Sequence, residues 1–395
     1  MDYEGAIDYL YNLKIYGMSL GLERIEYLLN VLGSPHKDLK VIHVTGTNGK
    51  STTKEMIASI VKMRYPTLKT EGNLNNHIGL PLTLLELNKS HKVAVVEMGM
   101  SAAGEIARLA EIAQPKIGVI TNVSQAHMIE LKTVKDIQKA KGELFKALPQ
   151  QGTAIVNADD PLVLELARSL RAKTVTFGID QPADVRASEI RNKDNLGFQF
   201  KVKIFDKTLS IHLSCLGYCN IYNSLAALAT GYSLGIQEDA MTRGLESYQH
   251  MGQRNEQTQH KGIDLINDAY NANPRSMTEA LKTLNDFKTQ GRRLFVIGDM
   301  LELGDRSVSA HHNLGEEIAH SKTNILVAVG KLAGLSAERV QALAGKTIQV
   351  QKFEDHQKAA EFLIHEAKNG DCVMFKGSRG AAMEKILQIF IANKN

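Results

Sequence analysis

The residues best suited to chemistry lie in a glycine-containing turn at residues 45–52, directly after an apolar run and before helix-forming residues. Gly46 and Gly49 would leave backbone N–H groups free to face an anion, and Lys50 would add a positive charge for the β- and γ-phosphates of a nucleotide. A hydroxyl of Ser51 or Thr52 could reach Mg²⁺. We predict an ATP phosphate-binding loop made of Thr45, Gly46, Thr47, Asn48, Gly49, Lys50, Ser51 and Thr52.

Two features of this loop qualify the prediction. The general phosphate-loop pattern requires a glycine five positions before Gly49, where this chain has Val44. A plain glycine turn between a strand and a helix is the alternative reading. The lysine and hydroxyl residues directly after the glycines favour the nucleotide site.

Three further residues are candidates for the same site. Glu97 ends an apolar run, so we expect it at the carboxyl end of a parallel strand, where it could hold Mg²⁺ against the phosphates. His127 follows a short polar segment, and Lys141 lies in a lysine-rich helical segment. Taken singly, each is more often an ordinary surface or loop residue, so their weight depends on the motifs around them.

Composition narrows the classes of partner. The 395 residues carry a formal net charge of +4 from 47 basic and 43 acidic residues, with no basic block that would suggest nucleic-acid binding. The first residues are acidic rather than basic, and no apolar run approaches the roughly 20 residues of a membrane span. We expect a cytoplasmic, monomeric protein with small-molecule partners. Cys215, Cys219 and Cys372 are expected to be free thiols.

Hydrophobic patterning predicts an α/β protein. Apolar strands alternate with helices from Val41 to Val123, which indicates a mostly parallel sheet covered on both faces. Alternating residues at 198–202 and 209–213 predict a small antiparallel sheet attached to the first. A helix over 220–234 follows. Strands at 263–267, 293–298, 325–329 and 371–375, with helices between them, predict a Rossmann-like open sheet.

This pattern predicts three segments. Residues 1–40 would form two short amphipathic helices packed on the ATPase domain, 41–250 a P-loop ATP-binding domain, and 251–395 a Rossmann-like C-terminal domain.

From about residue 41 to the end, the chain resembles the Mur ligase superfamily and, within it, the MurF ligases. The motifs that carry this resemblance occur in the family's order: Thr45–Thr52, Glu97-Met-Gly99, Asn122-Val123 with His127, Lys139-Ala-Lys-Gly-Glu143, Asn157-Ala-Asp-Asp-Pro161, Asn220-Ile-Tyr-Asn223, Asn267–Met277, Gly298–Gly304 with His311, and Lys376-Gly-Ser-Arg379. The first forty residues look instead like the start of a folylpolyglutamate synthase, and we expect no room there for the longer N-terminal domain with which MurF proteins bind UDP. The resemblance implies that the C-terminal domain binds the amino acid or dipeptide. It also implies nucleotide-binding groups on both domains, so the site should lie in the cleft between them.

The resemblance implies an ADP-forming ligase that makes an amide bond through an acyl phosphate. It implies that His127 helps hold a second Mg²⁺, beside a first held by Ser51 or Thr52 and Glu97, and that CO₂ converts Lys141 to a metal-binding carbamate. It also implies that Arg254 reaches the phosphates. The residues implied at the nucleotide are Asn220, Asn223, Asp268, Tyr270 and Asn271, and those suggested at the amine substrate are Asn273, Asp299, Glu302, Lys376, Ser378 and Arg379.

Several functions remain open at this point. A MurF-like ligase would add a D-alanyl-D-alanine-type dipeptide or an amino acid to a peptide-bearing donor. A folylpolyglutamate synthase-type ligase would add glutamate, and a specialised two-domain Mur ligase would act on a cofactor or peptide without UDP. A non-catalytic Mur-type partner subunit is disfavoured, because Lys50, Glu97, His127 and Lys141 are all present.

Overall fold

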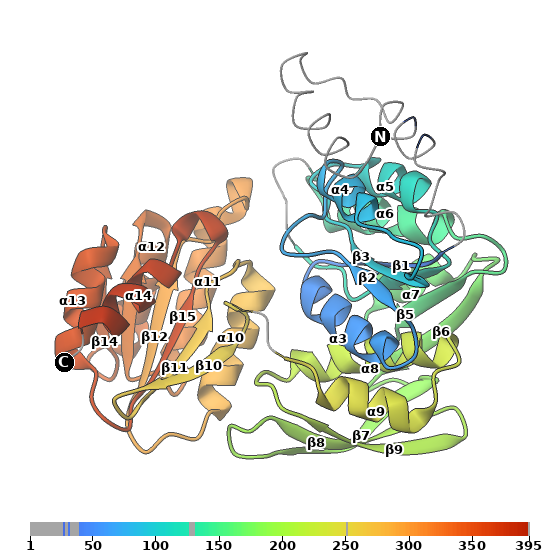
Figure 1. Ribbon diagram of the computed structural model, residues 1–395. Coiled ribbons are helices and arrows are strands. Elements are labelled where there is room, and N and C mark those ends of the chain that lie inside the picture. The colour runs from blue at the N-terminus through green and yellow to red at the C-terminus, as the bar shows by residue number, and fades with distance from the viewer. Residues whose placement is uncertain (1–26, 28–30, 32–38, 126–130, 250–251, 394–395) are drawn as a thin grey trace.

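Two β-sheets organise the chain, each at the centre of its own lobe (Figure 1). The structure is a computed structural model and describes residues 39–125, 131–249 and 252–393, together with Tyr27 and Val31. We call residues 39–249 the first lobe and residues 252–393 the second lobe. The two helices predicted within residues 1–40 lie almost wholly outside the described residues, and that prediction stays untested.

The first sheet contains, among the described residues, nine strands in the order β2-β3-β1-β4-β5-β6-β7-β8-β9. The parallel strands are apolar on both faces, and all but one residue of β1 are buried, because helices cover both sides of the sheet. The strands are β1 (Lys40–Thr45), β2 (Thr67–Lys69), β3 (Val93–Glu97), β4 (Ile117–Ile120), β5 (Thr153–Asn157), β6 (Lys173–Gly178), β7 (Val185–Asn192), β8 (Phe198–Ile204) and β9 (Lys207–Leu213).

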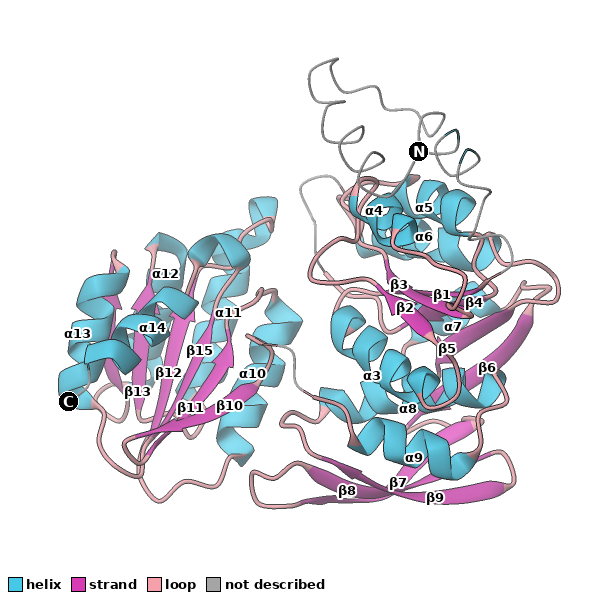
Figure 2. Ribbon diagram, in the orientation of Figure 1, coloured by secondary structure: helices cyan, strands magenta, loops and turns pink. Residues whose placement is uncertain are grey.

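The predicted antiparallel strands are present, and they continue the first sheet. Strand β7 pairs in parallel with β6 at Val185 and Arg186, and then β7, β8 and β9 pair antiparallel. Strand β8 alternates buried and exposed residues along its length, as one covered face requires. The sheet curls around α3 (Lys50–Lys62), α8 (Cys219–Ser233) and α9 (Glu238–Glu246), so one core joins these helices to strands from both ends of the sheet (Figure 2).

The other face of the first sheet carries four helices. Helices α4 (Gly79–Leu85) and α5 (Glu105–Ala113) cover β1 and β3, while α6 (Val134–Lys146) and α7 (Pro161–Ala167) cover β4 and β5. Thr133 begins α6 with a capping box in which its hydroxyl accepts from the Asp136 N–H and the Asp136 carboxylate accepts from the Thr133 N–H. This cap fixes the start of the helix that carries Lys141.

The second sheet has, in the described residues, six strands in the order β10-β11-β15-β12-β13-β14. Only β10 at one edge runs antiparallel, so the predicted open sheet is confirmed. The elements are β10 (Glu256–His260), β11 (Ile263–Asp268), α10 (Pro274–Asp286), β12 (Arg293–Gly298), α11 (Ser307–Ala319), β13 (Ile325–Val329), α12 (Lys331–Ala344), β14 (Gln349–Phe353), α13 (His356–Glu366), β15 (Cys372–Lys376) and α14 (Glu384–Asn393). Helices α10, α11 and α12 cover one face, and α13 and α14 cover the other.

Contacts between the lobes include one at the β7–β8 turn. The Asn195 side-chain amide donates to the Lys288 carbonyl at 2.6 Å, and the Lys288 N–H donates to Asn195 Oδ1 at 2.8 Å. The Lys288 ammonium also pairs with the Asp194 carboxylate. This paired arrangement ties the tip of the hairpin to the segment after α10.

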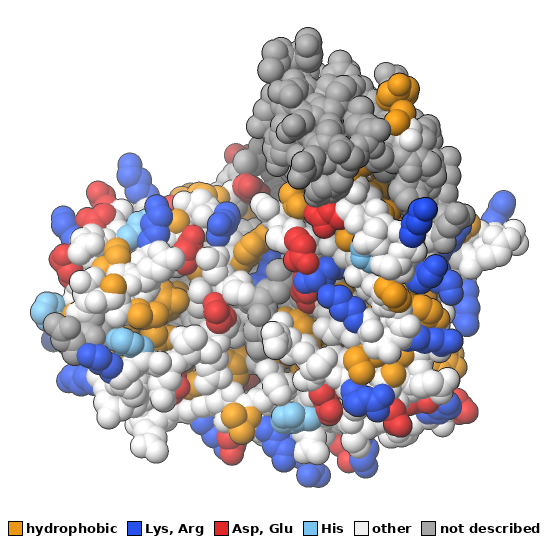
Figure 3. Space-filling view, in the orientation of Figure 1, with side chains coloured by type: hydrophobic (Ala, Val, Ile, Leu, Met, Phe, Trp, Pro, Cys, Tyr) orange, Lys and Arg blue, Asp and Glu red, His pale blue; other side chains and the backbone are white. Residues whose placement is uncertain are grey.

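The surface agrees with the mild net charge. On the face shown in Figure 3, basic and acidic side chains are interspersed rather than gathered by sign. No helix in the described part of the chain combines the length and the apolar character that crossing a membrane requires. All three cysteines are free, as predicted, with Cys215 and Cys372 buried and Cys219 half-buried.

One core residue makes the fold sensitive to acid. His43 in β1 is fully buried, and neither ring nitrogen has a hydrogen-bond partner among the described residues. Burial lowers the pKa of His43 to about 3, because the charged imidazolium would be desolvated.

We expect His43→Leu to remove part of the acid sensitivity. The unfolded chain binds a proton at His43 below about pH 6.5 and the folded chain only near pH 3, so this residue destabilises the fold as the pH falls between those values. Between pH 6 and pH 4, the free energy of unfolding of the variant should improve relative to the parent by about 2 to 3 kcal/mol. Urea unfolding at both pH values measures this, and parallel losses in the two proteins would contradict it.

Candidate active site

The predicted phosphate loop joins the end of β1 to the start of α3. No side chain caps this helix, whose first residue follows Gly49, so the first N–H groups of the helix remain available to an anion. The loop is fixed from the neighbouring strand end, since the Thr47 N–H donates to the Asn122 carbonyl and the Asn48 N–H donates to Asn122 Oδ1, both at 3.0 Å. The geometry matches that expected of an anion cradle.

Both loop glycines are required by close contacts as well as by backbone conformation. Gly46 has φ 148° and Gly49 has φ 80°, in the range that favours glycine. A Cβ at Gly46 would lie 1.9 Å from Thr121 Oγ1, and a Cβ at Gly49 would lie 2.3 Å from Asn223 Oδ1. The same Asn223 oxygen accepts from the Thr53 hydroxyl at 3.1 Å. Helices α3 and α8 are therefore joined directly behind the loop.

Asn220 and Asn223 lie one turn apart at the start of α8. The Asn223 amide donates to Asn220 Oδ1 at 2.8 Å, and the Asn220 amide donates to the Leu216 carbonyl at 2.6 Å. Both side chains line the cleft between the lobes, as expected for residues near a nucleotide.

Lys50 folds back over the loop. Its ammonium donates to the carbonyls of Gly46 at 2.9 Å and Thr47 at 3.2 Å. Burial lowers the pKa of Lys50, the nearby Glu97 carboxylate raises it, and the Arg254 guanidinium lowers it. An incoming phosphate would add negative charge beside a lysine that now has only one nearby carboxylate.

Glu97 stands at the end of β3 and is 3% exposed. Its Oε1 accepts from the Asn75 amide at 2.9 Å, whereas its Oε2 is buried and has no hydrogen-bond partner in the described residues. A buried carboxylate oxygen with no donor is suited to a divalent cation, and Mg²⁺ prefers oxygen ligands. The Ser51 hydroxyl lines the same cleft as Glu97, and these two oxygen-bearing side chains fit such an ion there. The described residues hold no cluster of three His, Cys, Asp or Glu side chains that could bind a metal by themselves.

Lys141 projects from α6 into the cleft and is 3% exposed. Its pKa lies well below its ordinary value, first because of burial and second because of the Lys50 charge. No hydrogen bond or ion pair joins its amine to any described residue. His127, the other predicted metal residue, lies outside the described residues, so its placement stays a prediction.

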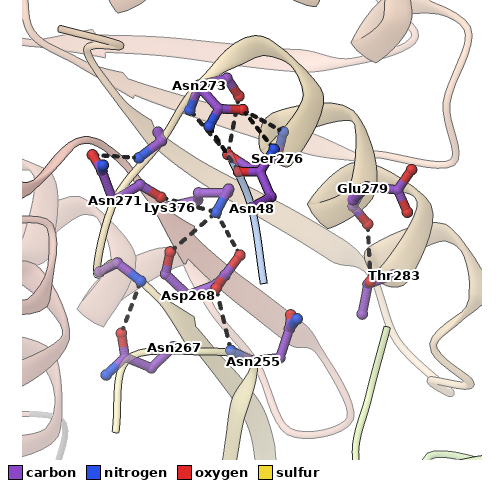
Figure 4. Close-up of polar contacts among 12 residues, drawn as sticks. Asn48, Asn255, Asn267, Asp268, Asn271, Asn273, Ser276, Glu279, Thr283 and Lys376 are labelled. Carbon is purple, nitrogen blue, oxygen red and sulfur yellow. Dashed lines mark hydrogen bonds and ion pairs between the residues drawn. The ribbon is translucent and has the colours of Figure 1, made fainter. Parts of the chain in front are cut away.

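The second lobe contributes a group of interacting residues that faces the phosphate loop. Arg254 Nη2 donates to Ser51 Oγ at 2.9 Å, and its guanidinium carbon lies 3.8 Å from the centre of the Tyr270 ring. Lys376 donates to Asp268 Oδ2 at 2.5 Å and to the Asn271 carbonyl at 3.2 Å (Figure 4). Arg254, Asp268, Tyr270 and Asn271 thus meet near the predicted nucleotide site.

Two asparagines join the lobes at the phosphate loop. The Asn273 amide donates to Asn48 Oδ1 at 2.7 Å, and the Asn48 amide donates back to Asn273 Oδ1 at 3.4 Å (Figure 4). Asn273 also caps α10 by accepting from the Ser276 N–H at 3.0 Å. The loop position is therefore linked to the start of a helix in the other lobe.

Several of the predicted amine-substrate residues lie together, since the Ser378 N–H donates to the Asp299 carbonyl at 3.1 Å and the Ser378 hydroxyl donates to the Ala272 carbonyl at 3.4 Å. The cleft is lined by Lys376 and Asn273 but not by Asp299, Glu302, Ser378 or Arg379. Asp299 accepts from the Ala333 N–H at 2.7 Å, the Ser378 hydroxyl accepts from the Leu301 N–H at 2.8 Å, and Arg379 donates to Gln253 at 2.9 Å. Since the Lys376 ammonium is already paired with Asp268, its role as an anion-binding group for the amine substrate stays a prediction.

The cleft has a volume of about 1090 Å³, which exceeds the usual range for a single small ligand. It is also lined by Asn75, Asn76 and His77, which the sequence interpretation missed. Their signal was a run of three polar residues directly before an apolar helix. The run meets β3 only in the folded chain, so its place in the cleft could not be predicted from the spacing of residues.

Comparison with known families decides the relationship. The chain matches the Mur ligase middle domain over residues 44–231 and the Mur ligase glutamate ligase domain over residues 253–379. The UDP-N-acetylmuramoyl-tripeptide–D-alanyl-D-alanine ligase of Bacillus subtilis is 36% identical over 353 residues, covering 89% of this chain and 76% of that protein. The enzyme of the same name from Escherichia coli is 33% identical over 360 residues, covering 90% and 77%. This chain belongs to the Mur ligase family.

Solved structures place it among the MurF members of that family. MurF from Acinetobacter baumannii has a TM-score of 0.84 at 33% identity, over 93% of this chain and 80% of its own. Folylpolyglutamate synthase from Mycobacterium tuberculosis, complexed with ADP, has a TM-score of 0.75 at 18% identity, over 98% and 99%, and shows a shared fold. The chain is thus an ATP-dependent, ADP-forming ligase of the MurF type, as predicted.

We expect Gly49→Ala to weaken nucleotide binding at least tenfold, because a Cβ would force Asn223 away from the loop and strain the backbone. Gly235→Ala is the matched control. That residue has φ 68°, and its nearest neighbour would be an ordinary 3.7 Å from the added Cβ. Fluorescent ADP titration measures both variants. Equal weakening in both, or in neither, would contradict the contact argument.

Proposed function

We propose that this Mur ligase joins D-alanyl-D-alanine to UDP-N-acetylmuramoyl-tripeptide. The named relatives carry out this reaction by name, and they cover most of the chain at 29–38% identity. The observation that carries the proposal is the cleft itself, where an uncapped helix N-terminus and Lys50 face Arg254 and Asp268 of the second lobe. We further propose that residues 41–250 form the ATP-binding domain and residues 251–395 the acceptor-binding domain, and that one chain suffices.

The proposed chemistry has two steps. A substrate carboxylate attacks the γ-phosphoryl group of ATP, which gives an acyl phosphate and ADP, and the acceptor amine then displaces phosphate to form the amide. The N–H groups at the start of α3 and the Lys50 ammonium stabilise the charge on the transferring group, and Arg254 adds a second cation from the other lobe. Ser51 or Thr52 with Glu97, His127 and Lys141 would hold Mg²⁺, which neutralises phosphate charge when bound.

Lys141 is proposed to act as a carbamate. Its buried amine has a lowered pKa and no partner among the described residues. A neutral amine is the form that reacts with CO₂, and the product carries a negative charge that suits the cations around it. The same burial would be unfavourable for a permanent ammonium beside Lys50.

A folylpolyglutamate synthase-type reaction is the second candidate. That enzyme shares the fold of this chain, with a TM-score of 0.75. The donor would then lack a UDP group.

The deciding experiment measures ADP release with ATP and Mg²⁺ for two substrate pairs, with Glu97→Gln as the inactive control. We expect turnover with UDP-N-acetylmuramoyl-tripeptide plus D-alanyl-D-alanine, and a loss of at least a hundredfold in the variant, because the variant lacks the charge that faces the cation. Turnover only with tetrahydrofolate plus glutamate would overturn the proposal in favour of the second candidate. Normal turnover in Glu97→Gln would overturn the site assignment.

We expect ¹³C-bicarbonate to give a carbamate signal in the NMR spectrum of the purified protein, lost in Lys141→Met. Lys139→Met, which changes an exposed lysine on the same helix, should keep the signal. The physical reason is that burial holds the pKa of Lys141 well below its ordinary value, which favours the neutral amine that reacts with CO₂. A spectrum without the signal at saturating bicarbonate would argue for an ordinary amine.

A further inference from the structure

The Glu97 carboxylate has a single protein partner in the described residues. Asn75 donates its side-chain N–H to Oε1 at 2.9 Å, and Oε2 is left buried without a donor. A glutamate side chain has three rotatable bonds, so one fixed oxygen determines where the other one points. The asymmetry between the two oxygens is therefore set by Asn75.

Asn75 is itself held at the end of β3. Its carbonyl accepts from the Gly99 N–H at 2.8 Å, two residues beyond Glu97. A Cβ at Gly99 would lie 3.2 Å from Asn75 Oδ1, so the side-chain amide packs against a residue that has no side chain. The asparagine is thus fixed through both its backbone and its side chain.

A second contact fixes the backbone of Glu97 from the other direction. The Glu97 N–H donates to the Thr70 hydroxyl at 3.1 Å, and the Thr70 N–H donates to the Val95 carbonyl at 3.1 Å. The Thr70 carbonyl accepts from the ammonium of Lys54, which is fully buried in α3. The helix that begins at the phosphate loop therefore also anchors the segment that carries Asn75.

We infer that Asn75 is a positioning residue for Glu97, which holds Oε1 so that Oε2 faces a divalent cation bound beside the phosphates. The inference rests on the proposed role of Glu97 in the ligase reaction. It adds a residue that no sequence motif indicated, and it explains why a half-buried asparagine side chain lies at this strand end. Outer partners of this kind typically change metal affinity 10- to 100-fold when they are removed.

The test measures Mn²⁺ binding to the protein–ADP complex by electron paramagnetic resonance, a readout independent of turnover. Asn75→Ala should weaken Mn²⁺ binding about tenfold and raise the Mg²⁺ concentration for half-maximal ADP release by a similar factor. Asn88→Ala, at an exposed position in the loop between α4 and β3, is the matched control and should change neither. Thermal unfolding of each variant separates loss of fold from loss of positioning.

Asn75→Asp provides a test that does not depend on a cavity. Its carboxylate would lie beside the Glu97 carboxylate, and the repulsion between the two charges would make the pair take up a proton at a higher pH. As the pH is lowered, Mn²⁺ binding should therefore weaken at a higher pH than in the parent. In Glu97→Gln, adding Asn75→Ala should cause little further loss, since a positioning residue acts through its partner.

Three results would overturn the inference: parent-like Mn²⁺ affinity in both Asn75 variants, equal losses in Asn75→Ala and Asn88→Ala, or a full tenfold loss from Asn75→Ala in the Glu97→Gln background. Failure of the proposed function looks different. In that case the parent would show no turnover with UDP-N-acetylmuramoyl-tripeptide and D-alanyl-D-alanine, while the Mn²⁺ effect of Asn75 would remain.

Discussion

The open N-terminus of α3 is the constraint on which the site depends. A helix start without a side-chain cap leaves backbone donors unsatisfied, and here a residue with positive φ at Gly49 brings them to the floor of the cleft. Glycine is required at this position because Asn223 of α8 occupies the space that any side chain at residue 49 would need. Burial lowers the pKa of both Lys50 and Lys141, and the charge of Lys50 lowers the pKa of Lys141 further. A bound anion would accept hydrogen bonds from these N–H groups and offset the positive charge beside them.

The two lobes meet around the same loop. Arg254 contacts Ser51, and Asn273 contacts Asn48, so residues that hold the phosphate cradle also hold the second lobe against it. Asn195 and Lys288 add a contact at the other end of the cleft. Because hydrogen bonds of this kind are short-ranged, opening the cleft by even a few ångströms would break them together. The relative position of the two lobes is thus coupled to the position of the phosphate loop.

Much of the fold was predictable from the sequence. Most of the parallel strands are apolar runs of four to six residues separated by helical patterns, and β12 and β13 have the predicted bounds, whereas β2 has only three residues and β14 is largely polar. The antiparallel strands β8 and β9 alternate with period two, so their type was also predictable, but the parallel pairing of β7 with β6 that joins them to the first sheet was not. A strand pairing depends on where two distant segments meet, and periodicity contains no such information.

The candidate site divides in the same way. The phosphate loop was predictable from the glycines, lysine and hydroxyl residues at consecutive positions, although Asn122 and Asn223 from distant segments hold it in place. Tertiary structure decided the rest: Asn75 reaches Glu97 from a separate loop, the Lys376 ammonium pairs with the Asp268 carboxylate, and Asp299 contacts Ser378 outside the cleft lining. A side chain's partner is set by the packing of elements far apart in the chain, and the energy of a buried polar group depends on that partner rather than on its neighbours in sequence.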